Sequence, residues 1–300
     1  MKLIVQPDSG VGPIVSAIKR AKKSVDVLIF RLDVEEVASA LSDAVSRGVV
    51  VRALTAHENR GGTKRLRKLE ARFLECGVTV SQTADDLVRY HGKMMIVDGR
   101  TLHVYGFNFT RLDMTESRSF GIVTRNLRLV QEATRLFEAD CARQDYTAGS
   151  SQFVVSPVNA RERLAAFIKG AKKQLLIYDP KVSDRSMLRI LTERVKAGVD
   201  VRIIGKLGSA KTGVTAEKYP GKHLHVRAIL RDGSDVFVGS QSLRKLELDH
   251  RREVGVIVRN QSIAREVSAI FEGDWARTGA APRDGKRQEQ GRQETGENVA

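Results

Sequence analysis

The chain has 300 residues, of which 41% are hydrophobic and 29% are charged, a composition typical of globular proteins and not of disordered ones. No run of about 18 apolar residues occurs, so the sequence predicts no membrane-spanning helix. The first ten residues lack the apolar core of a signal peptide, and two cysteines, Cys76 and Cys141, indicate neither a disulfide framework nor a zinc site. We therefore expect a cytoplasmic protein.

The net charge of +15 and the isoelectric point near 10 indicate an anionic partner. Residues 280–300 hold four basic and four acidic residues, so the excess positive charge belongs to the rest of the chain. Nucleic acid, an anionic lipid surface and a phosphate-bearing substrate all fit this charge. A basic surface that only keeps the protein in solution fits it too.

Strands and helices alternate along the first half of the sequence, which indicates an α/β layer with parallel strand pairs. After a short first strand, the expected elements are a helix at 14–22, a strand at 25–30, a helix at 34–46 ended by Gly48, a strand at 49–54, a helix up to Cys76, a strand at 78–81, a hairpin at 90–110, a strand at 119–124 and a helix at 127–143. The basic segment at 60–68 is read as a solvated helix face, or as a flank to the entrance of an anionic substrate.

The second half of the sequence repeats the first. The segment AIKRAKK at 17–23 corresponds to FIKGAKK at 167–173, an offset of 150, and FEADCAR at 137–143 corresponds to FEGDWAR at 271–277, an offset of 134. The offset falls because a Gly- and Lys-rich loop replaces the helix of the first half.

We therefore expect a duplicated protein with domains at 1–147 and 151–279, a linker around 146–152 and a disordered tail at 280–300. Such an internal pseudo-dimer predicts a monomer.

The hairpin at 90–110 carries polar residues suited to binding a phosphate. His91 and Lys93 are two residues apart and would project to the same side of a strand, and Asn108 is expected on the returning strand. Asp98 precedes Gly99 in a tight turn, so a structural role is expected for it. One His-x-Lys pair would be weak evidence, because a hydrogen-bonded structural histidine is more common.

The second hairpin repeats this pattern at an offset of 134. His91, Lys93, Asp98 and Asn108 correspond to His225, Arg227, Asp232 and Ser242, and the spacing H-x-[KR]-x4-D-G is identical in both copies. Asp232 is expected to be structural, like Asp98. The repetition favours catalysis over a structural role for the two histidines. His223 would share a face with His225, but a solvated strand end is expected there.

Both hairpins resemble the signature of the phospholipase D superfamily, H-x-K-x4-D-x6-G-S-x-N, over roughly residues 1–279. The resemblance implies two α/β domains with mixed sheets flanked by helices, related by a pseudo-two-fold axis, whose hairpins meet at one active site. It also implies phosphodiester chemistry, as in phospholipases, cardiolipin and phosphatidylserine synthases, and nucleases.

Several positions depart from that signature. Tyr105-Gly106 replaces the Gly-Ser pair in the first copy, whereas the second keeps Gly239-Ser240. An acidic residue that orients the histidine usually follows each motif. Glu253 fills that place in the second half, where it could alternatively pair with Arg251 or Arg252, and Ser119 occupies the equivalent place in the first half.

The expected mechanism divides the chemistry between the two histidines. His91 would attack phosphorus to give a phosphohistidine, and His225 would protonate the leaving oxygen. Lys93 and Arg227 would hold the non-bridging oxygens, with Asn108, Ser240 and Ser242 as hydrogen-bond donors and Glu253 orienting an imidazole. No cofactor and no metal are expected, because the cation beside each histidine would oppose a divalent ion.

The favoured function is hydrolysis of phospholipid phosphodiesters, or the related phosphatidyl transfer, by a hydrolase of lipid degradation that could contact the membrane surface. The first alternative is a metal-independent nuclease, which the charge supports, although the 5% aromatic content gives no evident base-stacking groove. The second alternative is a non-catalytic binder of anionic lipid or nucleic acid whose second motif has degenerated.

Overall fold

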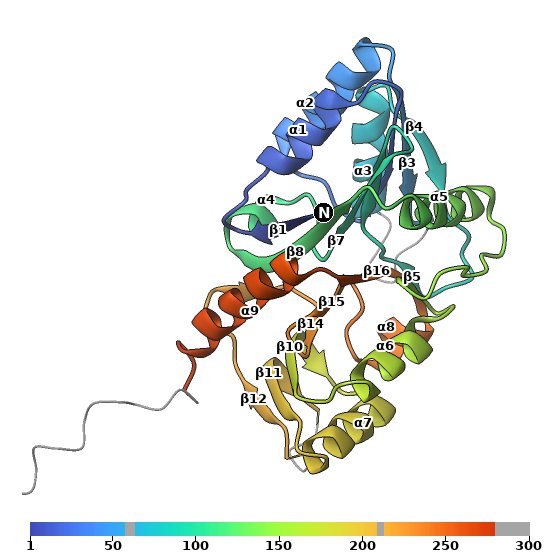
Figure 1. Ribbon diagram of the computed structural model, residues 1–300. Helices are drawn as coiled ribbons and strands as arrows, with labels where there is room; N and C mark the ends of the chain where they lie inside the picture. The colour runs from blue at the N-terminus through green and yellow to red at the C-terminus, as the bar shows by residue number, and fades with distance from the viewer. Residues whose placement is uncertain (58–63, 209–212, 280–300) are drawn as a thin grey trace, which may run out of the picture.

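The computed structural model describes residues 1–57, 64–208 and 213–279. The chain forms two α/β halves, which lie one above the other in Figure 1. The predicted tail at 280–300 and parts of the basic segment at 60–68 and of the Gly- and Lys-rich loop lie outside the described residues.

The first half contains strands and helices close to the expected ones. Its elements are β1 (Lys2–Gln6), α1 (Gly12–Arg20), β2 (Ser24–Leu28), α2 (Glu35–Ser46), β3 (Val50–Thr55), α3 (Lys64–Glu75), β4 (Thr79–Gln82), β5 (Arg89–Tyr90), β6 (Met94–Val97), β7 (Thr101–Tyr105), α4 (Arg111–Thr115), β8 (Ser117–Thr124) and α5 (Leu127–Ala142).

The second half repeats this order without a counterpart of α3. Its elements are β9 (Phe153–Ser156), α6 (Ala160–Lys169), β10 (Gln174–Val182), α7 (Arg185–Lys196), β11 (Asp200–Leu207), β12 (Thr215–Glu217), β13 (His223–Leu224), β14 (Ala228–Arg231), β15 (Asp235–Gly239), α8 (Lys245–Asp249), β16 (Arg251–Arg259) and α9 (Gln261–Trp275). In the described part of the chain no helix stands between β11 and β12, where the sequence predicts the loss of one.

Each half contributes one mixed sheet with helices on its faces. The first sheet has the order β1-β8-β7-β6-β2-β3-β4, and the second has the order β12-β11-β10-β14-β15-β16 with β9 beside β16. Parallel pairs such as β2 with β3 lie next to antiparallel pairs such as β6 with β7. The predicted α/β fold with two duplicated halves is confirmed.

The two sheets exchange a short strand with each other. The strand β5 of the first half pairs in parallel with β16, and the strand β13 of the second half pairs in parallel with β8. Figure 1 shows β5 beside β16 between the two halves. Each of these strands directly precedes a motif histidine, so the exchange places both histidines at the seam.

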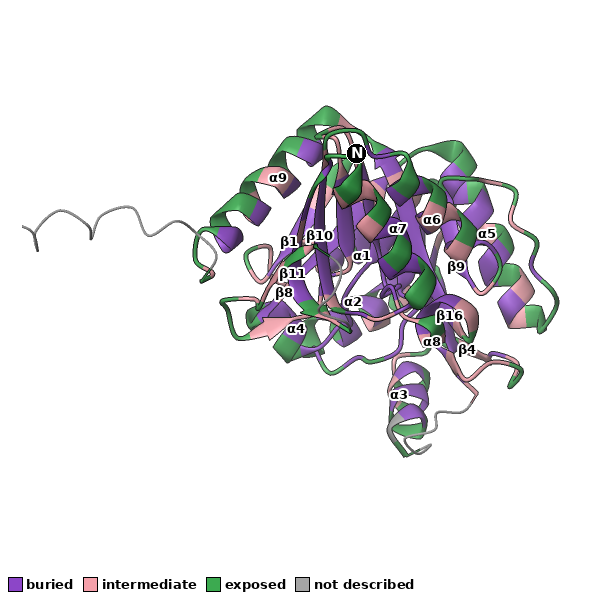
Figure 2. Ribbon diagram, turned by 90° about the horizontal axis from the view of Figure 1, so that it is seen from below, coloured by how far each residue is buried: buried purple, intermediate pink, exposed green. Residues whose placement is uncertain are grey.

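The apolar core has three layers, and the central one holds the halves together. Side chains from both sheets and from α5 and α9 form this central layer, for example Phe120, Tyr178 and Val254. The helices α1 and α2 cover the outer face of the first sheet, and α6 and α7 cover that of the second. Figure 2 shows the resulting buried sheets between partly exposed helices.

Two symmetry-related ion pairs also join the halves. Arg118 of β8 contacts Asp274 of α9 at 3.0 Å, and Arg252 of β16 contacts Asp140 of α5 at 3.1 Å. Both aspartates are buried, so each arginine and carboxylate is paired across the seam rather than within its own half. Arg118 directly precedes position 119 and Arg252 directly precedes position 253, and each of these two positions faces a motif histidine.

Two expectations about the first hairpin were wrong. His91, Gly92 and Lys93 do not belong to a strand, because they form the extended link between β5 and β6. The returning strand ends at Tyr105, so Asn108 lies in the bend that leads into the unpredicted helix α4. That bend allows residues 106–110 to approach the seam between the halves.

Asp98 and Asp232 receive main-chain hydrogen bonds in corresponding turns. Asp98 accepts N–H groups from Lys22, Lys23 and Ser24 at 2.6–3.1 Å, and Asp232 accepts those of residues 172–174 at 2.7–3.1 Å. Both aspartates have positive φ, 54° and 50°. Burial would raise the pKa of Asp98, but these N–H groups outweigh it and hold the pKa below its usual value.

Replacing Asp98 by Ala leaves the N–H groups before β2 without their acceptor. We expect the free energy of unfolding to fall by about 1–3 kcal/mol, measured by urea denaturation. The matched variant Asp232→Ala should lose a similar amount. A stable Asp98→Ala protein that has lost catalysis would indicate a chemical role instead.

Candidate active site at the seam between the halves

His91 is positioned by strand pairing across the seam. Tyr90 of β5 lies opposite Arg252 of β16, and the His91 main-chain N–H donates to the Arg252 carbonyl at 2.7 Å. This register brings the His91 imidazole next to Glu253, and its Nδ1 lies 3.0 Å from both carboxylate oxygens. An Nδ1–H that donates to Glu253 leaves the Nε2 lone pair free to act as a nucleophile.

Lys93 completes the first motif. Its Nζ lies 3.1 Å from Nδ1 and 3.2 Å from Nε2 of His91, and it donates to the His91 carbonyl at 2.7 Å. Its side chain is fully buried, whereas that of His91 keeps 12% of its surface exposed. The cation and the imidazole therefore face the same space, as the sequence spacing predicts.

His225 is positioned in the corresponding way by β8. Its main-chain N–H donates to the Arg118 carbonyl at 3.1 Å, so the residue that faces it by symmetry is Ser119. Its actual acidic partner is Asp113 of α4, whose Oδ1 lies 2.6 Å from Nδ1. The same carboxylate accepts the N–H of Asn108 at 2.9 Å.

Each histidine is thus bonded to a carboxylate of the opposite half. Glu253 orients the histidine of the first motif and not that of its own half, so the expected assignment within the second half was wrong. Asp113 was missed altogether. The pattern Thr110-Arg-Leu-Asp113 is a helix-start signal, and the Thr110 hydroxyl does accept the Asp113 N–H. That signal could have revealed α4, but not its contact with His225.

The two hairpins meet at the seam. Tyr105-Gly106 corresponds to Gly239-Ser240. A Cβ atom added to Gly106 would lie 3.0 Å from the Ser119 hydroxyl and 3.1 Å from the Phe120 carbonyl oxygen of its own half, and 3.2 Å from the Gly239 carbonyl oxygen of the other half. A side chain at position 106 would therefore be crowded from both halves.

The charges of the two motifs act on one another. Burial lowers the pKa of His91 well below its usual value, and the charges of Lys93, Arg227 and His225 lower it further. Burial lowers the pKa of Lys93 to about 7, with Glu253 opposing and Arg227 adding to the effect. Burial also lowers the pKa of His225 to about 4, although its hydrogen bond to Asp113 opposes the shift. The four basic side chains of both motifs therefore share one site.

The pKa values of the two carboxylates that contact the histidines are shifted in opposite directions. Burial would raise the pKa of Asp113, but the hydrogen bond to His225, the charge of His225 and the Asn108 N–H together outweigh it and hold the pKa well below the usual value. Burial raises the pKa of Glu253, and Lys93 and Ser240 only partly oppose this. Asp113 is consequently the stronger stabiliser of a protonated histidine.

Arg227 is held from several sides. Its guanidinium donates to the Ser242 hydroxyl at 3.2 Å and to the His225 carbonyl at 2.7 Å. Behind Ser242 lies Asp179, a carboxylate that sequence reasoning missed. Burial raises the pKa of Asp179 to about 6, with main-chain N–H groups and the charge of Arg227 opposing this. The Ser242 hydroxyl and the His225 carbonyl therefore orient Arg227.

The remaining predicted residues lie around the histidines. The Ser240 hydroxyl accepts the Val254 N–H at 3.2 Å, so it is engaged with β16. Asn108 is 5% exposed, and its Oδ1 has no hydrogen-bond partner in the structure. His223 is partly buried and lies 2.7 Å from the Ser117 hydroxyl, which corrects the expectation of a solvated strand end.

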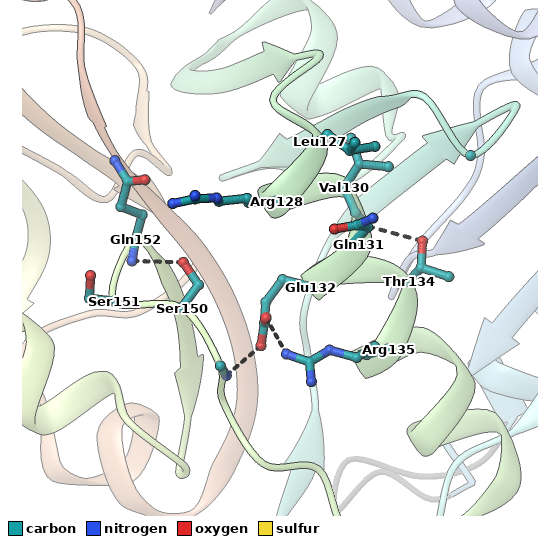
Figure 3. A pocket seen from close by; sticks show the side chains of 12 residues that line it. Leu127, Arg128, Val130, Gln131, Glu132, Thr134, Arg135, Ser150, Ser151 and Gln152 are labelled. Carbon is teal, nitrogen blue, oxygen red and sulfur yellow. Dashed lines mark hydrogen bonds and ion pairs between the residues drawn. The ribbon is translucent and has the colours of Figure 1, made fainter.

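A hollow of about 830 Å³ lies away from the histidines, between the N-terminal part of α5 and the linker. Figure 3 shows Glu132 at its centre, where the carboxylate accepts the Gly149 N–H at 2.7 Å and pairs with Arg135. None of the predicted site residues lines it. These contacts hold the linker against α5.

Two further observations concern metals and membranes. Within the residues that the structure describes, no group of three or more His, Cys, Asp and Glu side chains is arranged to hold a metal ion. None of the described helices is long and apolar enough to cross a membrane.

Removing the charge of Asp113 should impair catalysis through His225. We expect Asp113→Asn to lower kcat about 10²- to 10⁴-fold with a small change in KM, because the imidazolium loses its partner. Steady-state kinetics on a chromogenic diester measures this. Adding Ser119→Glu to that variant restores a carboxylate at the symmetric position and should recover part of kcat. An unchanged kcat in Asp113→Asn would contradict the role.

Comparison with known proteins concerns the fold. Residues 14–141 match the family model described as "Cardiolipin synthase, PLD-like domain". A polyphosphate kinase from Porphyromonas gingivalis superposes with a TM-score of 0.74 at 18% identity, covering 91% of this chain. A phosphatidylserine synthase from Haemophilus influenzae Rd KW20 superposes with a TM-score of 0.66 at 10% identity, covering 92% of this chain and 85% of its own.

The chain spans 50% of the length of that polyphosphate kinase. No curated protein sequence matches the chain significantly. The predicted resemblance is confirmed: residues 14–141 form a phospholipase D-like domain, and the two halves together have the duplicated fold that these solved enzymes share.

Proposed function

We propose that the protein is a phosphodiesterase that acts through a covalent phosphohistidine. The observation that carries the proposal is the pair of crossed dyads, His91 with Glu253 and His225 with Asp113, in which a carboxylate contacts each Nδ1 and the Lys93 Nζ lies 3.2 Å from the His91 Nε2. Two imidazoles held in this way supply a nucleophile and a proton donor for one phosphorus atom.

The surroundings support His91 as the nucleophile. The Lys93 cation lies against its ring, and the pKa of Glu253 is raised by burial, so both favour a neutral imidazole. The ionised carboxylate of Asp113 favours a protonated His225. The negative charge of a bound diester raises the pKa of both histidines, and His225 is the better placed to take the proton.

The reaction then proceeds in two steps. The His91 Nε2 forms a bond to phosphorus while the bond to the leaving oxygen breaks, and His225 gives its Nε2 proton to that oxygen. Water, or an alcohol in a transfer reaction, next attacks phosphorus and gives its proton to His225, and the P–N bond to His91 breaks. Lys93 and Arg227 hold the non-bridging oxygens throughout, and Asn108 lies beside them.

Ser240 and Ser242 act less directly than expected from the sequence. Ser240 fixes β16 beside Glu253, and Ser242 orients the guanidinium of Arg227. Each motif supplies a histidine held by a carboxylate and a neighbouring basic side chain, which favours an enzyme over a binder with a degenerate second motif. Because one chain supplies both dyads, we propose that a monomer is the active unit.

Hydrolysis of phospholipid, or phosphatidyl transfer, remains the substrate expectation that the family description favours. The proposal of a phospholipid substrate includes a cytoplasmic location for the protein and contact with the membrane surface. Cleavage of nucleic acid is the second candidate, supported by the net charge of +15.

Trapping the phosphoenzyme tests the assignment of the two histidines. We expect label from a ³²P-diester to stay on the wild-type protein after rapid acid-free denaturation and to be absent from His91→Ala. His225→Ala should still take label from a diester with a p-nitrophenolate leaving group, which needs no proton. Label retained by His91→Ala would contradict the assignment.

The pH dependence tests the role of Lys93. Its pKa of about 7 means that the cation is present below pH 7 and is lost as the pH rises. We expect kcat/KM to fall more steeply above pH 7 than below it, by about a further tenfold per pH unit, because a second required proton is lost from the free enzyme there. Lys93→Arg should remove this additional fall and leave the one due to His225. A profile that is flat between pH 7 and 9 would contradict the prediction.

A further inference from the structure

A cluster of arginines lies beside His91 and is not used by the mechanism above. Arg89 of β5 and Arg251 of β16 lie directly opposite each other in the parallel pair that joins the halves. Like charges at such cross-strand positions are destabilising. Burial, followed by the charge of Arg251, lowers the pKa of Arg89, as expected for a crowded cation.

The cluster faces the same way as the catalytic residues. Arg89 precedes His91 by two residues, and Arg251 precedes Glu253 by two, so each arginine is on the face of its catalytic neighbour. The ring of Phe30 connects them: it lies 4.9 Å from the His91 ring and 5.3 Å from the Arg89 guanidinium carbon. Arg31 lies over the same ring at 5.8 Å.

The positive charge of the cluster is only partly balanced by the protein. Arg251 pairs with Glu247 at 3.0 Å and lies 3.9 Å from Glu253, but in the parts of the chain that the structure describes neither Arg31 nor Arg89 has a carboxylate partner. The Nε atoms of Arg89 and Arg251 are buried without a hydrogen-bond partner. Buried donors in this number favour an anion as their partner.

The other side of the site has no such cluster. The residues that correspond to Arg89 and Arg251 are His223 and Ser117, which bond to each other at 2.7 Å. Pro180 and Lys181 stand where the first half has Phe30 and Arg31. Among the described residues at these corresponding positions, the flank next to His91 therefore has three arginines, and the flank next to His225 has one lysine, Lys181.

We propose that Arg31, Arg89 and Arg251 form a subsite for a second phosphate, adjacent to the one that is cleaved, and that the substrate class is single-stranded nucleic acid. This inference rests on the proposed phosphodiesterase function. A nucleic-acid strand carries a phosphate one nucleotide from the scissile one, and Arg89 lies about 7 Å along the strand from His91. A phospholipid with one phosphodiester offers nothing to this flank.

The distribution of apolar side chains supports nucleic acid over lipid. Among the described residues the exposed large hydrophobic side chains are Met1, Val50, Leu74, Leu112, Leu127 and Val158, and no two of them share a helix or strand. A lipid surface would favour a contiguous apolar patch beside the site. The arginine and phenylalanine combination is instead typical of sites that hold phosphates and bases.

Two substrates distinguish an effect on the arginine subsite from an effect on cleavage of the phosphodiester bond. Bis-p-nitrophenyl phosphate has one phosphorus atom, whereas a short single-stranded oligodeoxynucleotide presents a flanking phosphate. We expect Arg89→Gln to lower kcat/KM roughly 10- to 100-fold more on the oligonucleotide than on the small diester, and Arg89→Lys to recover part of that loss. Arg259→Gln, at the exposed far end of β16, is the matched control and should change neither.

Binding gives a readout that does not depend on turnover. In the His91→Ala background, Arg89→Gln should weaken oligonucleotide binding and reduce the slope of log K against log salt by about 0.7. The melting temperature should not fall, since the variant relieves repulsion between Arg89 and Arg251. Equal losses on both substrates with an unchanged salt slope would overturn the subsite.

Two other outcomes have distinct meanings. If Arg89→Gln weakens binding to phosphatidylglycerol vesicles, or cleavage of their lipid, but leaves the oligonucleotide unaffected, nucleic acid is the wrong substrate class. If the wild-type protein fails to cleave bis-p-nitrophenyl phosphate, the proposed function fails. In that case the salt slope with oligonucleotide still decides whether the arginines bind a phosphate.

Discussion

The exchange of the short strands β5 and β13 between the two sheets is the constraint on which the site depends. Each strand has two residues, yet its register fixes which residue of the opposite half faces a motif histidine. Tyr90 opposite Arg252 places His91 at Glu253, and the ion pair of Arg252 with buried Asp140 holds the register from behind. Neither half can build the site alone.

The internal symmetry is close in the backbone and imperfect in the side chains. The position that bears Glu253 in one half bears Ser119 in the other, and the missing carboxylate is supplied by Asp113 from a helix turn six residues earlier. Glu247, the counterpart of Asp113, holds arginines instead. The two halves thus give the histidines different environments: burial lowers the pKa of both, and the hydrogen bond to Asp113 opposes that shift at His225.

The sequence predicted the alternating elements, the duplication and the convergence of the two motifs. Those predictions rest on the local periodicity of apolar residues and on the identical spacing of the two motifs. Both can be recognised in a single sequence. It could not predict Asp113, because the contact with His225 depends on a cross-half register that no local pattern encodes. The same holds for the arginine cluster, in which Arg89 and Arg251 are 162 residues apart and meet only through the exchanged strand.

The proposed chemistry and the arginine subsite have different physical requirements, although both lie at the seam between the halves. The dyads need burial, which lowers the pKa of both imidazoles in the empty site. The arginines need an anion to relieve their repulsion. A nucleic-acid strand satisfies both requirements. One phosphate raises the pKa of the histidines, and the neighbouring phosphate pairs with the arginine cluster.

The central claim is that His91 and His225 act on one phosphorus atom from opposite sides. A crystal structure of the protein with orthovanadate tests it most directly, because vanadate adopts the five-coordinate geometry of the transition state. The account predicts a vanadium atom bonded to the His91 Nε2, with the His225 Nε2 hydrogen-bonded to the apical oxygen opposite. Vanadate that contacts only one of the two imidazoles, or binds away from the seam, would contradict it.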